Sequence, residues 1–147
     1  MALNIKSRKK KDMVYNTMEF PCEEFGEGIK RQVRLAVSPQ TTGEQRISLV
    51  FTIIPPGAVS EGHIHSDCDE YIFFESAGRA ILDGVEFEVP AKAVVHAKTG
   101  VKHECINISQ QKNLNLFCVF TPPFEPYGLY NSLIPKTKSY LGDAGVG

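Results

Sequence analysis

The sequence predicts an all-β protein, built as a sandwich or barrel of short strands, and three observations favour this class. Runs rich in β-branched and aromatic residues recur along the 147-residue chain. Turn-forming residues, mainly glycine, proline and aspartate, separate these runs at even spacing. Little of the chain has helical periodicity. Short strands separated by regular turns are typical of β-sandwiches and β-barrels.

Each predicted strand is an alternating or β-branched run that ends at a turn. In chain order, the predicted strands are 32–37, 46–54, 70–75, 79–82, 85–89, 93–97, 103–108 and 113–121. One face of the run 46–54 is wholly apolar, with Ile47, Leu49, Phe51 and Ile53. Asp83-Gly84 between two short runs is a strong signal of a two-residue hairpin. Pro122-Pro123 closes the series.

The two ends of the chain have a different texture. Residues 1–12 are basic with few apolar side chains, so we expect a flexible tail. By length, residues 13–147 form one domain. The segment 124–147 carries aromatic residues among prolines and glycines. The segment is too irregular for a defined element to be predicted, and we expect part of it to pack on the outer sheet or across a subunit boundary.

Composition excludes several classes of function. A net charge of −1 gives no electrostatic basis for binding nucleic acid or an anionic membrane. No apolar run reaches the length of a membrane span, and no secretory signal is evident, which predicts a cytoplasmic protein. The four cysteines are scattered without a C-x-x-C pair, which predicts free thiols. Cys105 follows His103 by two residues, and we interpret it as a small buried hydrophobic residue rather than a ligand.

Three of the four histidines, together with one glutamate, have the pattern of a metal site. His63 and His65 are separated by one residue, and on a strand residues i and i+2 face the same side. Glu70 and His103 would complete a mixed nitrogen and oxygen shell. Such a shell suits one divalent ion of iron, manganese, nickel, cobalt or zinc and leaves positions open for a ligand.

The spacing of these residues resembles the two sequence motifs of the cupin family. The first motif is matched by Gly57, His63, His65 and Glu70, and Gly78 falls one residue later than the motif's closing glycine. The second motif is matched by Gly100, His103 and Asn107, whereas its first glycine and its proline are replaced by Lys92 and Lys98. These two departures concern the turns more than the metal site.

The resemblance covers about residues 45–122 and implies a double-stranded β-helix, the jelly-roll barrel of cupins. It implies one divalent transition metal bound by His63, His65, Glu70 and His103. It also implies a small-molecule ligand or substrate and a homodimer built by sheet extension.

Among the functions that the resemblance implies, we expect first a metal-dependent dioxygenase acting on a small polar organic molecule. One alternative is a redox-neutral decarboxylase, isomerase or lyase acting on a hydroxy acid, keto acid or sugar derivative. A second alternative is a cupin that binds a small ligand without catalysis. The ligand set alone does not choose among these.

Two further residues are candidates for the chemistry. His96 is the histidine outside the ligand set, and it would serve as a general acid or base if it reaches the pocket; otherwise it faces solvent. Arg46 shares a face with Ser48 and Thr52. If that face looks into the barrel, Arg46 would bind an anionic substrate; if it looks out, Arg46 is ordinary surface.

Overall fold

The structure is a computed structural model, and it describes residues 14–145. The expected tail, residues 1–12, lies outside the described residues. The described elements, in chain order, are the 3₁₀ turn η2 (Thr17–Glu19), β1 (Glu23–Phe25), β2 (Arg31–Val37), β3 (Ser48–Ile54), β4 (Val59–His63), β5 (Asp69–Phe74), β6 (Gly78–Leu82), β7 (Val85–Val89), β8 (Val94–Ala97), β9 (His103–Ile106), β10 (Leu114–Thr121) and α1 (Tyr130–Gly145).

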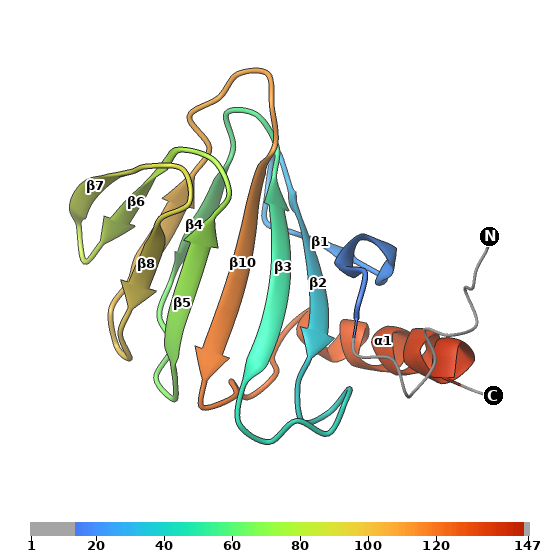
Figure 1. Cartoon of the computed structure of the whole chain (residues 1–147). Coiled ribbons are helices and arrows are strands. Elements are labelled where there is room, and N and C mark those ends of the chain that lie inside the picture. The colour runs from blue at the N-terminus through green and yellow to red at the C-terminus, as the bar shows by residue number, and fades with distance from the viewer. Residues whose placement is uncertain (1–13, 146–147) are drawn as a thin grey trace.

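The strands form two antiparallel sheets, as the sequence predicts. The larger sheet has the order β1-β2-β3-β10-β5-β8, and the smaller has the order β4-β9-β6-β7. Figure 1 shows the larger sheet in front, with the smaller sheet behind it and to the left. Neighbours such as β3 and β10 are far apart in sequence, which is the crossover pattern of a jelly roll. The all-β jelly-roll prediction is confirmed.

Alternation along the strands places one set of side chains inside the barrel. In β10 every second residue is buried, from Leu114 to Phe120. In β3 the inward set includes Val50 and Ile54, which belong to the hydrophobic core, so the partly polar face of this strand looks into the barrel. The wholly apolar face of β3 therefore looks outward.

The turns have the geometry that their residues favour, with one exception. Asp83 and Gly84 join β6 to β7 with φ angles of 48° and 82°, which confirms the predicted hairpin. Lys92 has φ 71°, a left-handed conformation that glycine adopts at much lower cost. Lys92 is the residue that replaces the first glycine of the second cupin motif. The backbone shape of that motif is thus retained without its glycine.

The segment after Pro123 contains a helix, α1, for which the sequence predicted no defined element. Pro135 and Gly142 within the helix weaken the helical signal in the sequence. Packing compensates: Leu133 is fully buried, and the Thr137 hydroxyl donates a hydrogen bond of 3.0 Å to the carbonyl of Leu35 in β2. Leu133 and Tyr130 join the core of the barrel rather than its outer sheet. Neither helix of the described residues has the length and apolar character needed to cross a membrane.

Candidate metal centre

Both sheets contribute to one cluster of metal-ligating side chains. His63 is the last residue of β4, and His103 is the first residue of β9, which pairs with it in the smaller sheet. Glu70 lies in β5 of the larger sheet. His65 follows β4 by two residues. The barrel therefore holds these groups from opposite walls, which makes their relative positions a property of the whole fold.

The sequence predicts that His63 and His65 meet because they share one face of a strand. The structure brings them together in another way. Strand β4 ends at His63, and its pairing with β9 shifts register between Ser60 and His63. His65 lies beyond the strand, where its carbonyl accepts a hydrogen bond of 2.8 Å from the amide of Gly100. The two rings still converge, with centroids 5.3 Å apart. A bulge and a tethered loop, rather than an i, i+2 pattern, produce the pair.

The four predicted ligands lie within coordinating range of a common point. One donor atom from each of His63, His65, Glu70 and His103 lies within 4.8 Å of every other. Oε1 of Glu70 is 2.9 Å from Nε2 of His103 and 3.3 Å from Nε2 of His65. Three of the residues are buried and His63 is half-buried, so the cluster is largely removed from bulk water.

The hydrogen bonds within the cluster test whether a cation fits it. Nδ1 of His103 lies 3.1 Å from the carbonyl of Val101, which can only accept, so Nδ1 carries the proton of that bond. A neutral His103 then presents a lone pair at Nε2, facing a carboxylate oxygen 2.9 Å away. Two acceptors at this distance need a proton or a cation between them. Nε2 of His65 is also buried; it lies 3.3 Å from the same Glu70 oxygen but without the geometry of a hydrogen bond. The donor set therefore fits a divalent metal ion.

The environment shifts the pKa values of the cluster in different directions. Burial, reinforced by the neighbouring His103, lowers the pKa of His63 to about 4, so its lone pair is available at neutral pH. Burial alone would raise the pKa of Glu70, but the adjacent imidazoles of His103 and His65 outweigh it, and the pKa falls to about 2. Burial alone would lower the pKa of His103, but the Glu70 carboxylate outweighs it and the pKa is raised.

The cluster opens onto a small internal cavity of about 30 Å³. Besides the four ligands, its described lining consists of Arg31, Val50, Thr52, Ser60, Ile72, Cys105, Leu116, Cys118, Phe120, Tyr127 and Tyr130. Sequence reasoning missed Arg31 and Tyr127. The sequence could have indicated Arg31, because it alternates in phase with Val33 and Leu35, which are buried residues of the same strand. Tyr127 had no such signal, because it reaches the cavity from an irregular segment.

His96 lies outside this cavity. It projects from β8 beside Tyr71, with ring centroids 4.2 Å apart and nearly parallel planes. Its Nε2 is 2.8 Å from Oδ2 of Asp69, and Oδ1 of the same carboxylate accepts hydrogen bonds from the backbone amide and the hydroxyl of Thr99. These contacts lower the pKa of Asp69 to about 2, with the Thr99 hydroxyl as the largest cause. The structure does not bring His96 together with the metal ligands.

Arg46 also lies away from the cavity. Its side chain is 86% exposed and forms a bidentate ion pair with Glu44, with Nε 2.7 Å from a carboxylate oxygen. The chain enters β3 only at Ser48, so the alternation that carries Thr52 into the cavity does not extend back to Arg46. The polar face of the strand does look inward, but this residue is not part of it.

All four cysteines are free, as predicted. Cys105 and Cys118 line the cavity, and burial raises the pKa of both thiols well above the ordinary value. The thiols are therefore protonated at neutral pH. The geometric cluster of ligating atoms does not include them, in agreement with the interpretation of Cys105 as a small buried residue.

Comparisons with solved structures find the same barrel. A structure from Thermotoga maritima described as a predicted oxalate decarboxylase superposes with TM-score 0.65 at 17% identity, covering 75% of this chain and 99% of its own. An RmlC-like cupin from Shewanella frigidimarina gives TM-score 0.59 at 19% identity, covering 76% of this chain and 91% of its own. The Cnp3 cupin domain of Schizosaccharomyces pombe gives TM-score 0.62 at 10% identity, covering 75% of this chain and 74% of its own.

The sequence itself matches no protein-family model and no curated protein significantly. Identities below 20% in the three superpositions carry information about the fold rather than about the reaction. The chain therefore has the fold of a small cupin domain.

Proposed function

We propose that this protein is a metal-dependent cupin enzyme acting on a small polar organic molecule. One divalent transition-metal ion would be held by His63, His65, Glu70 and His103. The observation that carries the proposal is the convergence of these four donors, from both sheets, on one largely buried cavity. Three imidazoles and one carboxylate are a ligand set for iron, manganese, nickel, cobalt or zinc, and a six-coordinate ion would keep two positions open.

The protein's own contribution is to position the donors and to limit water. Phe120 packs edge-on against His65 with ring centroids 5.2 Å apart, and Tyr127 lies 6.4 Å from the same ring. The carbonyl of Val101 fixes the tautomer of His103, so that Nε2 faces the centre. When bound, the metal would supply a Lewis acid that polarises an oxygen of the substrate.

A dioxygenase is the first candidate reaction class, because a six-coordinate ion in this ligand set would keep two positions open for a chelating substrate and oxygen. A redox-neutral reaction is the second candidate, and the neighbour described as a predicted oxalate decarboxylase supports it. Oxygen uptake separates the two classes. Protein loaded with iron(II) is mixed with a panel of small hydroxy and keto acids, and oxygen is followed with an electrode. Uptake coupled to loss of an acid supports the dioxygenase, whereas turnover without uptake supports the alternative.

The metal site is tested with protein purified without a histidine tag. We expect about one equivalent of a transition metal by elemental analysis. The double variant His63→Ala/His65→Ala should lose more than about 100-fold in affinity for Co²⁺, because even changes outside the ligand sphere cost 10- to 100-fold. His96→Ala is the matched control, since this imidazole lies outside the cavity, and its metal content should equal that of the wild type.

Full metal occupancy in the double variant would overturn the site assignment, and the proposed function with it. Correct folding of the variants is checked by circular dichroism, since the barrel core does not depend on the two side chains being imidazoles.

A further inference from the structure

Arg31 is placed at the metal cavity by the pattern of its strand. It is the first residue of β2, and it shares the inward face with Val33 and Leu35, which are almost fully buried. Its guanidinium carbon lies 5.6 Å from the centroid of the Phe25 ring on the paired strand β1. Packing against an aromatic ring restrains the position of the guanidinium group beside the cavity that it lines.

Charge within the cavity favours an anion. Among the described lining residues, Arg31 is the permanent cation and Glu70 is the carboxylate. A divalent ion at the cluster would engage that carboxylate, so positive charge in the lining then exceeds negative charge. Arg31 also acts electrostatically on His63 and on Tyr127, which places its charge within range of both the ligands and the aromatic wall. An excess of positive charge in a partly dehydrated cavity is balanced by an anionic ligand.

The volume of the cavity limits the size of the anion that it can hold. A volume of about 30 Å³ corresponds to roughly two water positions, since one water needs about 10–15 Å³ on this measure. So small a cavity favours a short carboxylic acid that fills it at one end over a sugar ring or an aromatic acid. The hydroxyl groups of Thr52 and Tyr127 and the donors of Arg31 provide polar partners along the wall.

We propose that Arg31 binds the carboxylate of the substrate, and that the substrate class is short-chain carboxylic acids able to reach the metal at their other end. The planar fork of arginine matches the two oxygens of a carboxylate and is suited to bidentate binding. This inference rests on the proposed function, because it takes the metal cluster as the second anchor. Arg31 is here a specificity-determining residue, and Arg46, the candidate suggested by the sequence, is not.

The test uses the cobalt(II)-loaded protein with glycolate as the probe and glycolamide as its uncharged counterpart. Binding is followed by the change in visible absorption of the cobalt ion. Arg31→Gln should weaken glycolate binding by at least about tenfold, equivalent to about 1.4 kcal/mol, and change glycolamide binding by less than about threefold. Arg31→Lys keeps the charge but loses the planar fork, so its glycolate affinity should lie between those of the wild type and Arg31→Gln. Arg46→Gln is the matched control and should bind glycolate as the wild type does.

The outcomes separate the two proposals. Cobalt content is measured first, and failure of the wild type to load cobalt would overturn the metal site and the proposed function. Loaded protein whose glycolate affinity is the same in wild type and Arg31→Gln would overturn the role of Arg31 while leaving the metal site intact. If Arg31→Gln does not fold, Arg31→Lys decides, and wild-type glycolate affinity in that variant would contradict the inference.

Discussion

At the scale of single residues, the three imidazoles of the cluster differ because their surroundings differ. Burial and the neighbouring His103 lower the pKa of His63 to about 4, although the charge of Glu70 acts in the opposite direction. His103 lies 2.9 Å from Glu70, and its pKa is raised. The proton on His103 therefore competes with a metal at a higher pH than the proton on His63. His103 is the residue that sets the acid limit of metal binding.

Metal affinity should fall as the pH drops, beginning above pH 6.5. The sign follows from the raised pKa of His103, since the imidazole is still protonated where an ordinary histidine, with a pKa of about 6.5, would be half neutral. In Glu70→Gln the carboxylate is lost, so the acid-induced decrease should move to lower pH although affinity is weaker throughout. Competition titrations of Co²⁺ against a chelator at several pH values measure both effects. An unchanged pH profile in Glu70→Gln would contradict this assignment.

At the scale of elements, the turn between β7 and β8 holds a lysine in a strained left-handed conformation. The second cupin motif has a glycine at this position. Lys92 has φ 71°, and its amide donates a hydrogen bond of 2.8 Å to the carbonyl of Phe74. A left-handed conformation costs a residue with a Cβ atom about 1–2 kcal/mol relative to a right-handed one. This hydrogen bond to the end of β5 helps to hold the turn in that conformation.

Replacing Lys92 by glycine should stabilise the protein by up to about 1 kcal/mol. Glycine relieves the strain at positive φ and keeps the backbone hydrogen bond, although it adds conformational entropy to the unfolded chain. The matched control is Lys98→Gly, at the other motif position occupied by lysine, which has no positive φ. That change should lower stability by about 0.5–1 kcal/mol. Urea denaturation measures both, and a loss of stability in Lys92→Gly equal to that in the control would contradict the strain at Lys92.

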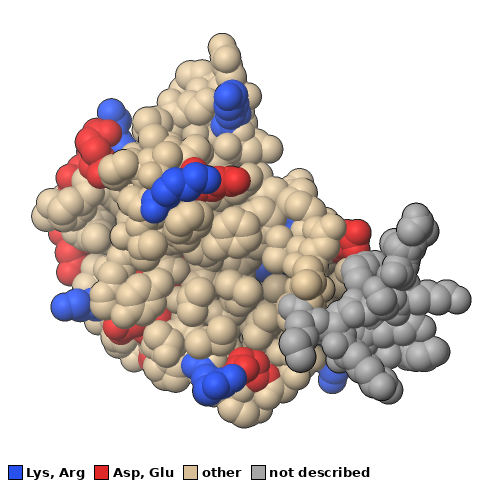
Figure 2. All heavy atoms as spheres, viewed as in Figure 1, with Lys and Arg blue, Asp and Glu red and all other residues tan. Residues whose placement is uncertain are grey.

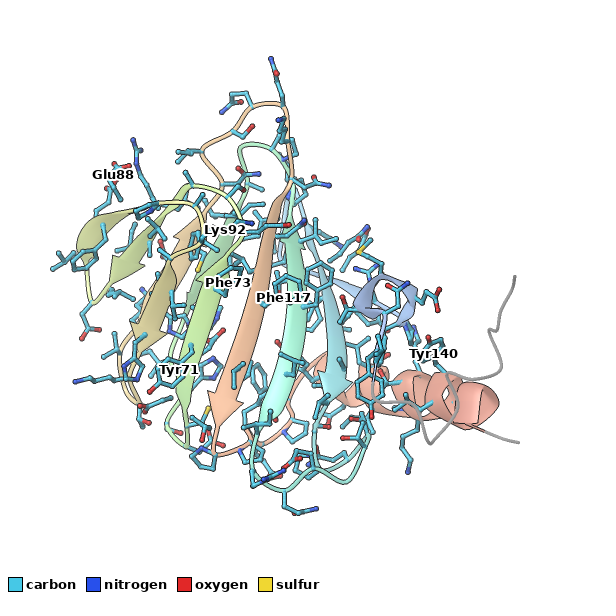
Figure 3. All side chains as sticks on the ribbon, in the orientation of Figure 1. Tyr71, Phe73, Glu88, Lys92, Phe117 and Tyr140 are labelled. Atoms are coloured by element: carbon cyan, nitrogen blue, oxygen red, sulfur yellow. The ribbon has the colours of Figure 1, made fainter. Side chains whose placement is uncertain are left out.

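At the scale of the whole molecule, the outer face of the larger sheet is mainly apolar across four strands, with His96 in β8 as the polar member. The register aligns two rows of outward side chains over β3, β10, β5 and β8. The rows are Phe51, Phe117, Phe73 and Val94, and Leu49, Val119, Tyr71 and His96. In Figure 2 the centre of this face is mostly uncharged, and most of the charged side chains in view lie away from it. Figure 3 shows Tyr71, Phe73 and Phe117 side by side on this face.

Such a face fits a second copy of the chain. A two-fold axis would place apolar row against apolar row, since the face carries no central charge that needs an opposite partner. The homodimer expected from the sequence stays a prediction, and we place its interface on this face rather than at a strand edge. Val94 is 57% exposed and lies within the rows, so it offers a site where a charge can be introduced without disturbing the core.

Light scattering should give a mass about twice the 16.3 kDa of one chain. Val94→Asp should shift the mass toward that of the monomer, because two buried carboxylates would face the apolar rows of the partner. Val85→Asp is the control, since Val85 is 56% exposed but lies at the tip of the β6–β7 hairpin. A monomeric wild type at working concentration would rule out the homodimer. Dimers that persist in Val94→Asp would place the interface elsewhere.

The sequence by itself determined the strand series apart from β1 and β4, the Asp83-Gly84 hairpin, and the residues of the candidate metal cluster. These depend on local chemistry: turn residues, β-branched runs, and side chains whose spacing matches a known motif. The departures at Lys92 and Lys98 changed neither the turns nor the cluster, because backbone conformation at these positions is held by neighbouring strands as well as by residue type.

Only the tertiary structure decided which face of each strand is inside and which charged group reaches the cavity. Alternation defines two faces of a strand but does not say which one is buried, and it is lost wherever the chain leaves the sheet. Arg46 precedes β3 and so lies outside, whereas Arg31 is in phase with a buried strand and lines the cavity. His65 reaches the cluster from a loop, and α1 forms despite Pro135 because Leu133 and Thr137 are buried against the barrel. Long-range packing determines these outcomes, since its energy depends on contacts between segments far apart in the chain.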